Sequence, residues 1–100
     1  MGWLKRSSYE SDMQIWDSVK DSDVGYVRRW VRYKAIKRIT NQQLLEQIVL
    51  KDEDSDVREE AINRITNQQL LDNLIYKFTK DPKKYTGELK LIDKQLKGIG

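Results

Sequence analysis

The sequence contains no cysteine and no histidine among its 100 residues. Without cysteine the chain has no disulfide framework, no thiolate nucleophile and no cysteine zinc site. Without histidine it lacks the commonest general base and the commonest transition-metal ligand. The sequence also has no Gly-rich phosphate loop, no paired catalytic carboxylates and no nucleophile arrangement. We therefore expect a non-catalytic, cytoplasmic protein that binds no cofactor and no metal.

Long apolar runs are missing as well. No stretch approaches the roughly 18 consecutive apolar residues that a membrane-spanning helix requires. The first eight residues, MGWLKRSS, carry charge but no apolar segment follows them, so we expect no secretory signal peptide. Hydrophobic residues make up 38% of the chain and charged residues 35%, which is typical of a soluble globular or helical-repeat domain. We expect a single domain that does not contact a membrane.

One segment of the sequence occurs twice. Residues 38–45 and residues 64–71 both read RITNQQLL. When residues 31–50 are aligned with residues 57–76, 12 of the 20 positions are identical. Self-similarity at a period of 20–50 residues is typical of stacked repeat architectures. The repeat therefore predicts an array of similar units.

The spacing of apolar residues predicts that each unit is a pair of helices. Val57, Ala61 and Ile65 recur at i, i+4 and i+8, which gives a helix one apolar face. Over the whole chain the spacing predicts an all-α fold of about six helices, at residues 8–20, 24–39, 41–50, 57–65, 67–79 and 88–97, with residues 82–87 either a first turn or a loop. The expected organisation is an N-terminal capping helix (1–23), two repeats (24–51 and 52–80) and a C-terminal capping helix (81–100).

The repeated octet also carries a capping signal. A threonine followed three residues later by a glutamine fits the capping box, in which the hydroxyl accepts a backbone N–H of the first turn. We therefore expect Thr40 with Gln43, and Thr66 with Gln69, to begin the second helix of each unit. Weaker versions of the same signal are Ser7 with Glu10 and Asp56 with Glu59.

The turn DEDSD at residues 52–56 places Asp52, Asp54 and Asp56 at positions 1, 3 and 5 of an EF-hand calcium loop. The loop also needs a glycine and a final glutamate, and Val57 and Asn63 stand at those places. We therefore predict a helix-capping turn here and no metal site.

The units resemble the short HEAT-like repeats of bacteria and archaea, in the pattern V-R-x-x-A-(V/I)-x-x-(I/L)-T-x-Q-x-L-L. The resemblance covers residues 24–80 and is carried by Val31-Arg32, Ala35-Ile36, Ile39-Thr40, Gln42 and Leu44-Leu45, and by Val57-Arg58, Ala61-Ile62, Ile65-Thr66, Gln68 and Leu70-Leu71. It implies an α–α superhelix that serves as a binding scaffold, with the second helices lining the concave surface. It also implies an aspartate and a basic residue near the start of a unit, here Asp54 or Asp56 with Arg58.

Two matching polar rows on the second helices are the leading candidate site. Amide side chains carry both donors and acceptors and can hydrogen-bond the main chain of an extended peptide. We therefore expect a protein or peptide partner on this face, although an ordinary solvated helix surface is the alternative. The positions are Asn41, Gln42, Glu46 and Gln47, repeated as Asn67, Gln68, Asp72 and Asn73.

A basic aromatic helix at residues 26–38 offers a second reading, as a nucleic-acid-binding module. Its candidate residues are Arg28, Arg29, Trp30, Arg32, Tyr33 and Lys37. Residues 26–51 carry seven Lys or Arg against one Glu, whereas residues 52–77 carry seven Asp or Glu against three Lys or Arg. The basic face is therefore local, which ranks this reading second. Alternatively, Trp30 and Tyr26 pack against the N-terminal helix and the charges are solvated.

Apolar residues near both ends of the chain complete the candidates. An array this short exposes apolar faces at its ends unless capping helices cover them. We expect these residues to serve as caps or as docking surfaces, and self-association is left open. They are Trp3, Leu4 and Trp16 at one end and Leu91 and Ile99 at the other.

Overall fold

Six helices make up the part of the chain that the computed structural model describes, residues 8–20 and 27–99, with the side chains of residues 27 and 28 excepted. No strand occurs in these residues, which confirms the expected all-α fold. The helices, in chain order, are α1 (Ser8–Asp17), α2 (Val27–Ile36), α3 (Gln42–Lys51), α4 (Ser55–Asn63), α5 (Gln68–Phe78) and α6 (Thr86–Ile99).

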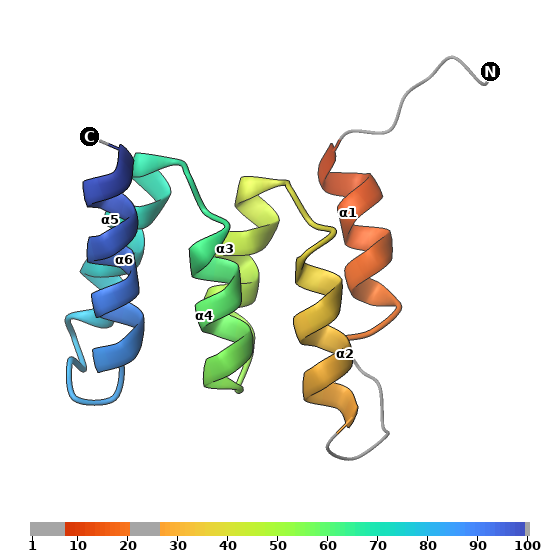
Figure 1. Cartoon of the computed structure of the whole chain (residues 1–100), viewed down its shortest axis with the longest axis horizontal. Coiled ribbons are helices and arrows are strands. Elements are labelled where there is room, and N and C mark those ends of the chain that lie inside the picture. The colour runs from red at the N-terminus through yellow and green to blue at the C-terminus, as the bar shows by residue number, and fades with distance from the viewer. Residues whose placement is uncertain (1–7, 21–26, 100) are drawn as a thin grey trace.

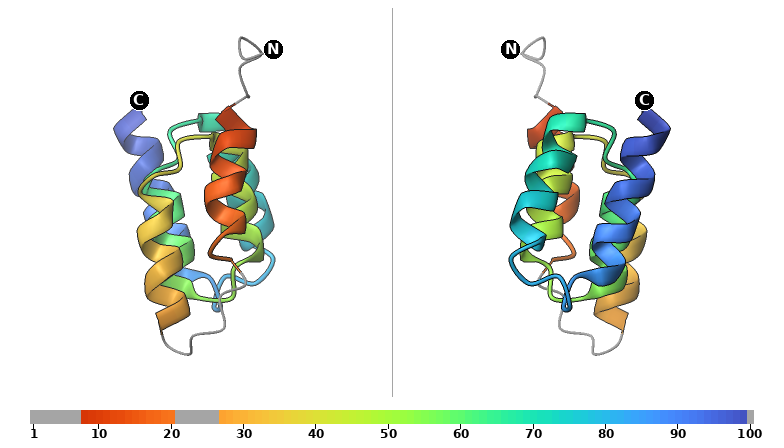
Figure 2. Two further views of the ribbon diagram at one scale, coloured as in Figure 1. Left: turned by 90° about the vertical axis from the view of Figure 1, so that its right-hand side faces the viewer. Right: turned by 90° about the vertical axis from the view of Figure 1, so that its left-hand side faces the viewer.

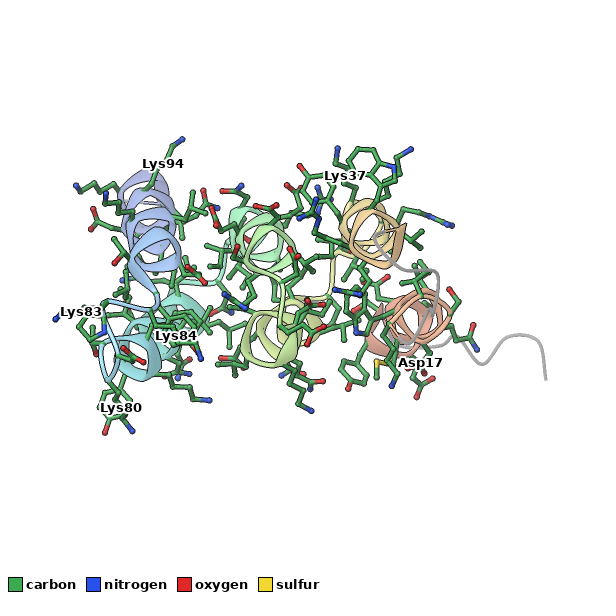
Figure 3. The ribbon with its side chains drawn as sticks, turned by 90° about the horizontal axis from the view of Figure 1, so that it is seen from below. Asp17, Lys37, Lys80, Lys83, Lys84 and Lys94 are labelled. Carbon is green, nitrogen blue, oxygen red and sulfur yellow. The ribbon has the colours of Figure 1, made fainter. Side chains whose placement is uncertain are left out.

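The helices stand in two rows of three (Figure 1). The first-helix row contains α2, α4 and α6, and the second-helix row contains α1, α3 and α5. Figure 3, a view along the helices, shows the two rows above and below one another. Chain direction alternates from helix to helix, so the helices are parallel within a row and antiparallel between rows (Figure 2).

The helices that pack together most closely are not the pairs that the sequence repeats. The most extensive contacts join α3 to α4, α4 to α6 and α5 to α6, and α1 packs on both α2 and α3. Three antiparallel pairs, α1 with α2, α3 with α4 and α5 with α6, stand side by side as the layers of the array (Figure 1). The repeated octet joins α2 to α3 and α4 to α5, and each of these connections passes from one layer to the next (Figure 1). The sequence unit is therefore out of phase with the packed layer.

A continuous core runs through all three layers, from Trp16 on α1 to Ile92 on α6. Fully buried aliphatic side chains occupy equivalent positions in the two units, and each stabilises the fold by about 1.5–3 kcal/mol. The equivalent pairs are Ile36 with Ile62, Ile39 with Ile65, and Leu45 with Leu71. The apolar face that the spacing predicted, Val57, Ala61 and Ile65, is fully buried in this core.

Helix α4 begins two residues earlier than the sequence predicted. Its N-cap is Asp54, whose carboxylate accepts hydrogen bonds from the backbone N–H groups of Asp56 and Val57. The expected box of Asp56 with Glu59 is therefore wrong, because Asp54 already satisfies the first free N–H groups of the helix. Residues 82–85, which the sequence predicted to be either a first turn or a loop, form a turn before α6. Two other expectations fall outside the described residues: the helical residues 24–26 and the capping signal at Ser7.

The second helix of each unit is capped by asparagine. The side-chain oxygen of Asn41 accepts from the Leu44 N–H at 3.0 Å, and that of Asn67 accepts from the Leu70 N–H at 3.1 Å. Both residues have the extended backbone that an N-cap requires. The repeated octet therefore ends one helix and starts the next, as expected.

The predicted capping boxes of the octet are wrong in their residues. Thr40 and Thr66 stand one position before the caps, and their hydroxyls accept no bond from the first turn. Gln43 and Gln69 are exposed and form no hydrogen bond with any described residue. Both the threonine and the asparagine of the octet are residue types that cap helices. The asparagine, one position later, is the residue that does so.

A side chain from the preceding second helix holds each octet in place. The buried carboxylate of Asp12 on α1 accepts from the backbone N–H groups of Thr40 and Asn41 at 2.8 and 2.7 Å. One layer later, Gln42 Oε1 on α3 accepts from the backbone N–H groups of Thr66 and Asn67 at 2.7 and 3.1 Å. Each layer therefore binds the polar backbone of the next connection.

Buried ion pairs link successive units. Arg32 on α2 makes a two-bond pair with Asp52, with Nε to Oδ2 at 2.8 Å and Nη2 to Oδ1 at 3.2 Å. The equivalent Arg58 on α4 pairs with Glu88 on α6, with Nη2 to Oε2 at 2.8 Å. Arg58 thus forms its ion pair with Glu88 and not with Asp54 or Asp56, the aspartates near the start of its own unit. None of the helices in the described residues is long and apolar enough to cross a membrane.

Candidate partner-binding surfaces

Three of the eight predicted partner-binding residues take part in the scaffold. Asn41 caps α3 and donates from Nδ2 to Ser8 Oγ at 2.8 Å, and Asn67 caps α5. Gln42 accepts from two backbone N–H groups through Oε1, and its Nε2 also donates to the carbonyls of Thr40 and Arg64, each at 3.2 Å. Their polar groups therefore serve the connections between layers.

The other five lie on or near the surface of the second-helix row. Glu46 and Gln47 are half-buried on α3, and Gln47 Oε1 accepts from the Tyr9 hydroxyl at 3.2 Å. The remaining three are exposed on α5 and form no hydrogen bond with any described residue: Gln68, Asp72 and Asn73. Exposed Leu50 and Tyr76 belong to the same two helices. This surface therefore combines free polar groups with large apolar side chains.

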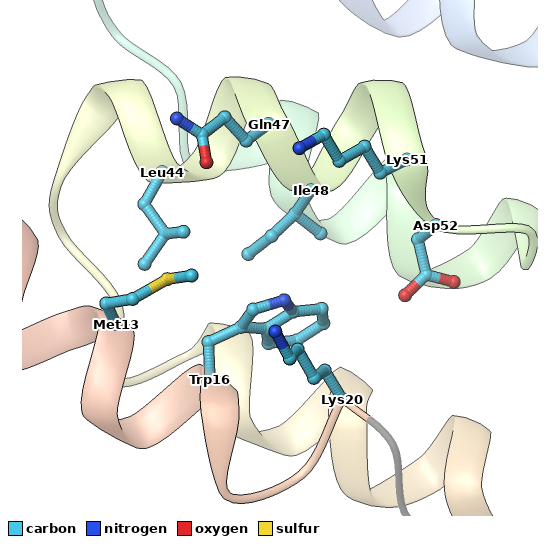
Figure 4. Close-up of a pocket in the computed structure, with 8 residues that line it drawn as sticks. All are labelled: Met13, Trp16, Lys20, Leu44, Gln47, Ile48, Lys51 and Asp52. Carbon is cyan, nitrogen blue, oxygen red and sulfur yellow. The ribbon is translucent and has the colours of Figure 1, made fainter.

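A groove of about 260 Å³ lies between α1 and α3 in the second-helix row (Figure 4). Its floor is apolar and its rim is polar. The floor consists of Met13 and Trp16 from α1 and Leu44 and Ile48 from α3, and the rim consists of Lys20, Gln47, Lys51 and Asp52. This combination of an apolar floor with a few polar groups is typical of binding sites in proteins.

Trp16 brings a free donor to this groove. The side chain is only 7% exposed, and its Nε1–H has no hydrogen-bond partner among the described residues. No fully buried side-chain nitrogen or oxygen in these residues lacks a partner, so the indole nitrogen is accessible to solvent. Figure 4 shows this nitrogen turned toward α3. A buried indole N–H normally has a partner.

A second groove, of about 520 Å³, lies between α2 and α4 in the first-helix row. Its two walls differ in charge. The α2 wall consists of Arg29, Trp30, Tyr33 and Lys37, and the α4 wall consists of Asp56, Glu59, Glu60 and Asn63. The groove thus brings the basic aromatic helix opposite an acidic one.

The aromatic side chains of α2 stand on the surface. Trp30 is 57% exposed and stacks on Tyr33, with the ring centroids 5.8 Å apart and the planes 8° from parallel. Lys34 Nζ lies 5.3 Å from the Trp30 ring, and Lys37 Nζ lies 5.2 Å from the Tyr33 ring. The alternative that Trp30 packs against the N-terminal helix is therefore wrong, while Tyr26 lies outside the described residues.

Two of the predicted nucleic-acid-binding arginines are paired with carboxylates. Arg32 is buried in its pair with Asp52. Arg29 is exposed and lies 3.8 Å from Asp54 and 3.7 Å from Asp56. The side chain of Arg28 lies outside the described residues. Four of the six residues predicted to bind nucleic acid line the second groove: Arg29, Trp30, Tyr33 and Lys37. Arg32 is buried and does not reach this surface.

The acidic wall perturbs two titratable groups. The pKa of Glu59 is raised, first by burial and then by the negative charges of Glu88 and Asp56. The pKa of the Tyr33 hydroxyl is raised mainly by the Glu60 carboxylate across the groove. Carboxylates of α4 thus contribute to both shifts, although burial is the larger cause for Glu59.

Sequence reasoning named Trp16 as a cap or docking residue but missed the groove that surrounds it. Of the other floor residues, Leu44 and Ile48 are buried core side chains. Lys51 was not among the candidate site residues, because a single lysine before an acidic turn does not indicate a binding site. A scan against protein-family models, a search of curated proteins and a search of solved structures each found no match to the chain.

Proposed function

We propose that the protein is a non-catalytic protein-interaction module of the HEAT-like type, which binds a protein or peptide partner on its second-helix row. The observation that carries the proposal is the apolar groove between α1 and α3, with its polar rim. Apolar anchors that enter such pockets, surrounded by polar contacts, supply most of the free energy of typical protein interfaces. The absence of cysteine is consistent with a cytoplasmic location.

Two exposed side chains extend this surface along the row. Leu50 on α3 is 37% exposed and Tyr76 on α5 is 69% exposed. Tyrosine is enriched at the energetic centres of interfaces because it combines a large apolar area with a hydroxyl. The polar side chains of Glu46, Asp72 and Asn73 lie on the same helices and supply hydrogen-bonding groups for a partner.

The nucleic-acid alternative has less support. A phosphate backbone is attracted by uncompensated positive charge. Here Arg32 is neutralised by Asp52, and the wall that faces Trp30 and Tyr33 carries Asp56, Glu59 and Glu60. If the alternative were correct, DNA or RNA would bind at low salt, and Arg29→Glu with Lys37→Glu would abolish that binding.

Affinity capture from native-cell extract, with two matched variants, tests the proposal. Leu50→Ser with Tyr76→Ser alters only the second-helix row, and Trp30→Ser with Lys34→Ser alters only the first-helix row. All four residues are exposed, so both variants should keep the helical content and stability of the parent. We expect loss of captured partners with the first variant and retention with the second.

The opposite result, with capture lost only in the Trp30 and Lys34 variant, would assign partner binding to the first-helix row and overturn the proposal. Light scattering of the parent protein at rising concentration, measured in parallel, separates partner binding from self-association. A purely self-assembling protein would form concentration-dependent oligomers and would capture only itself.

A further inference from the structure

We propose that the groove between α1 and α3 binds an acidic segment of the partner, in which a large aliphatic side chain stands next to an aspartate or glutamate. The aliphatic side chain fills the apolar floor and the carboxylate meets the donors around it. The inference rests on the proposed function and adds the chemistry of the partner to it. Three observations support it, and each concerns a different group in the groove.

The first observation is the unpaired donor of Trp16. An indole nitrogen donates one hydrogen bond and accepts none. Trp16 is more than nine-tenths buried, and its N–H is turned toward α3 on the other side of the groove (Figure 4). The group that completes this site must therefore carry an acceptor, such as a carboxylate or a carbonyl oxygen. An aliphatic side chain alone would leave the donor unpaired and desolvated, which is unfavourable.

The second observation is the charge at the rim. Lys51 is exposed and forms no ion pair with any described residue. The acidic member of the rim, Asp52, is already neutralised by its two bonds to Arg32. The groove therefore presents uncompensated positive charge beside the Trp16 donor. Charge-assisted hydrogen bonds to a carboxylate are shorter and stronger than those to a neutral carbonyl oxygen, which favours an acidic side chain.

The third observation is the size of the groove. Its volume of about 260 Å³ lies below the range of roughly 300–1,000 Å³ in which most small-molecule sites fall. A space of this size matches one or two side chains of a polypeptide segment. Met13 in its wall has a flexible and polarizable side chain that adapts to different apolar side chains. The size of the groove and its adaptable wall therefore favour a segment of polypeptide as the occupant.

A pair of synthetic peptides tests the inference on the full chain. The probe is EELLEELLEE, and the neutral control QQLLQQLLQQ keeps its leucines and its length. The readout is the indole ¹H–¹⁵N resonance of Trp16, which Trp16→Phe identifies by its disappearance. We expect the acidic peptide to shift this resonance to saturation. The neutral peptide should bind about tenfold more weakly, and the difference should shrink with added salt.

Charge reversal at the rim gives a second arm. Lys51→Glu should weaken the acidic peptide about tenfold, whereas Lys90→Glu, an exposed change on α6 in the other row, should leave its affinity unchanged. The Trp30 indole resonance is an internal control, because it lies in the first-helix row and should not move.

Two results would overturn the inference. Equal binding of the acidic and neutral peptides would show an apolar groove that does not select carboxylates. Absence of any saturable shift at Trp16 with either peptide would show that the groove does not bind such segments. Either result rules out an acidic segment in this groove and leaves open a partner of other chemistry on the second-helix row. Capture through Leu50 and Tyr76 is measured separately and tests that row, so failure here is distinguishable from failure of the proposed function.

Discussion

Gln42 on α3 and Asn67 at the start of α5 are 25 residues apart in the chain, and Gln42 Oε1 accepts a hydrogen bond from the Asn67 backbone N–H at 3.1 Å. The same oxygen accepts from the Thr66 N–H, and the amide nitrogen of Gln42 donates to the Arg64 carbonyl. The neutral side chain of Gln42 thus joins two layers, because it pairs with backbone N–H groups and with a backbone carbonyl. Gln68 has the same place in the repeat and has no such partner among the described residues.

This contrast predicts different effects of the same substitution. Gln42→Ala leaves the Thr66 and Asn67 N–H groups without their acceptor, so we expect the free energy of unfolding to fall by about 1–3 kcal/mol. Gln68→Ala removes no bond between described residues and should change it by less than about 0.5 kcal/mol. Urea denaturation measures both. Equal effects of the two changes would contradict the assigned role of Gln42.

The capping assignment predicts that asparagine, and not glutamine, stabilises the start of α3 and of α5. Asn67→Ala removes the oxygen that accepts from the Leu70 N–H, and we expect a loss of about 0.5–2 kcal/mol. Gln69→Ala should be nearly neutral, because its exposed side chain forms no hydrogen bond with any described residue. Thermal unfolding of the two variants checks this. A larger loss with Gln69→Ala would restore the capping box.

The buried pair of Arg32 with Asp52 predicts a large effect of removing one partner. Arg32→Ala leaves the Asp52 carboxylate buried and unpaired by any cation, so we expect a loss of about 3–5 kcal/mol in the free energy of unfolding. Lys97→Ala removes the exposed pair of Lys97 with Asp93 and should cost less than about 1 kcal/mol. Chemical denaturation of both variants at the same pH is the measurement. A small effect at Arg32 would mean that water replaces the guanidinium.

The raised pKa of Glu59 predicts a pH-dependent effect on stability. Because burial and neighbouring carboxylates disfavour the ionised form, the folded state holds this proton to higher pH than the unfolded state does. Ionised Glu59 therefore destabilises the fold above its raised pKa, and this penalty disappears as pH falls below the ordinary value of about 4.3. We expect Glu59→Gln to be more stable than the parent at pH 7 and to lose that advantage near pH 4.

Denaturation of parent and variant across pH 4–8 tests the sign of this effect. Glu53→Gln, an exposed change in the turn before α4, is the control for loss of one negative charge. If Glu59→Gln were less stable than the parent at pH 7, the carboxylate would be stabilised by a cation and the direction of the shift would be wrong.

The repeated apolar spacing predicted the helices and the core well, because both depend on local periodicity. Val57, Ala61 and Ile65 are buried where that periodicity places them. The connections were predicted less well. Asp12 binds the backbone of Asn41 from 29 residues away, and no local pattern distinguishes this aspartate from a solvated one.

The candidate site was only partly predictable for the same reason. Gln47 and Asp72 are on the expected row, whereas Gln42 is turned into the connection between layers. The groove at Trp16 depends on how α1 packs against α3, and the sequence unit contains only one of these two helices. Whether a residue at the boundary between two units lines a groove depends on both units, so the sequence of one unit does not predict it.

The mismatch between the sequence repeat and the packed layer has a consequence for how such a chain can change in length. A segment such as residues 31–56 begins in one layer and ends in the next, so it carries Arg32, the octet and Gln42 together. Inserting a copy at the exposed acidic turn would add a helix from each row together with the groups that fasten them to their neighbours. Gene duplication at this boundary would therefore lengthen the array without creating a new kind of interface, whereas duplication of the packed pair would cut through the octet.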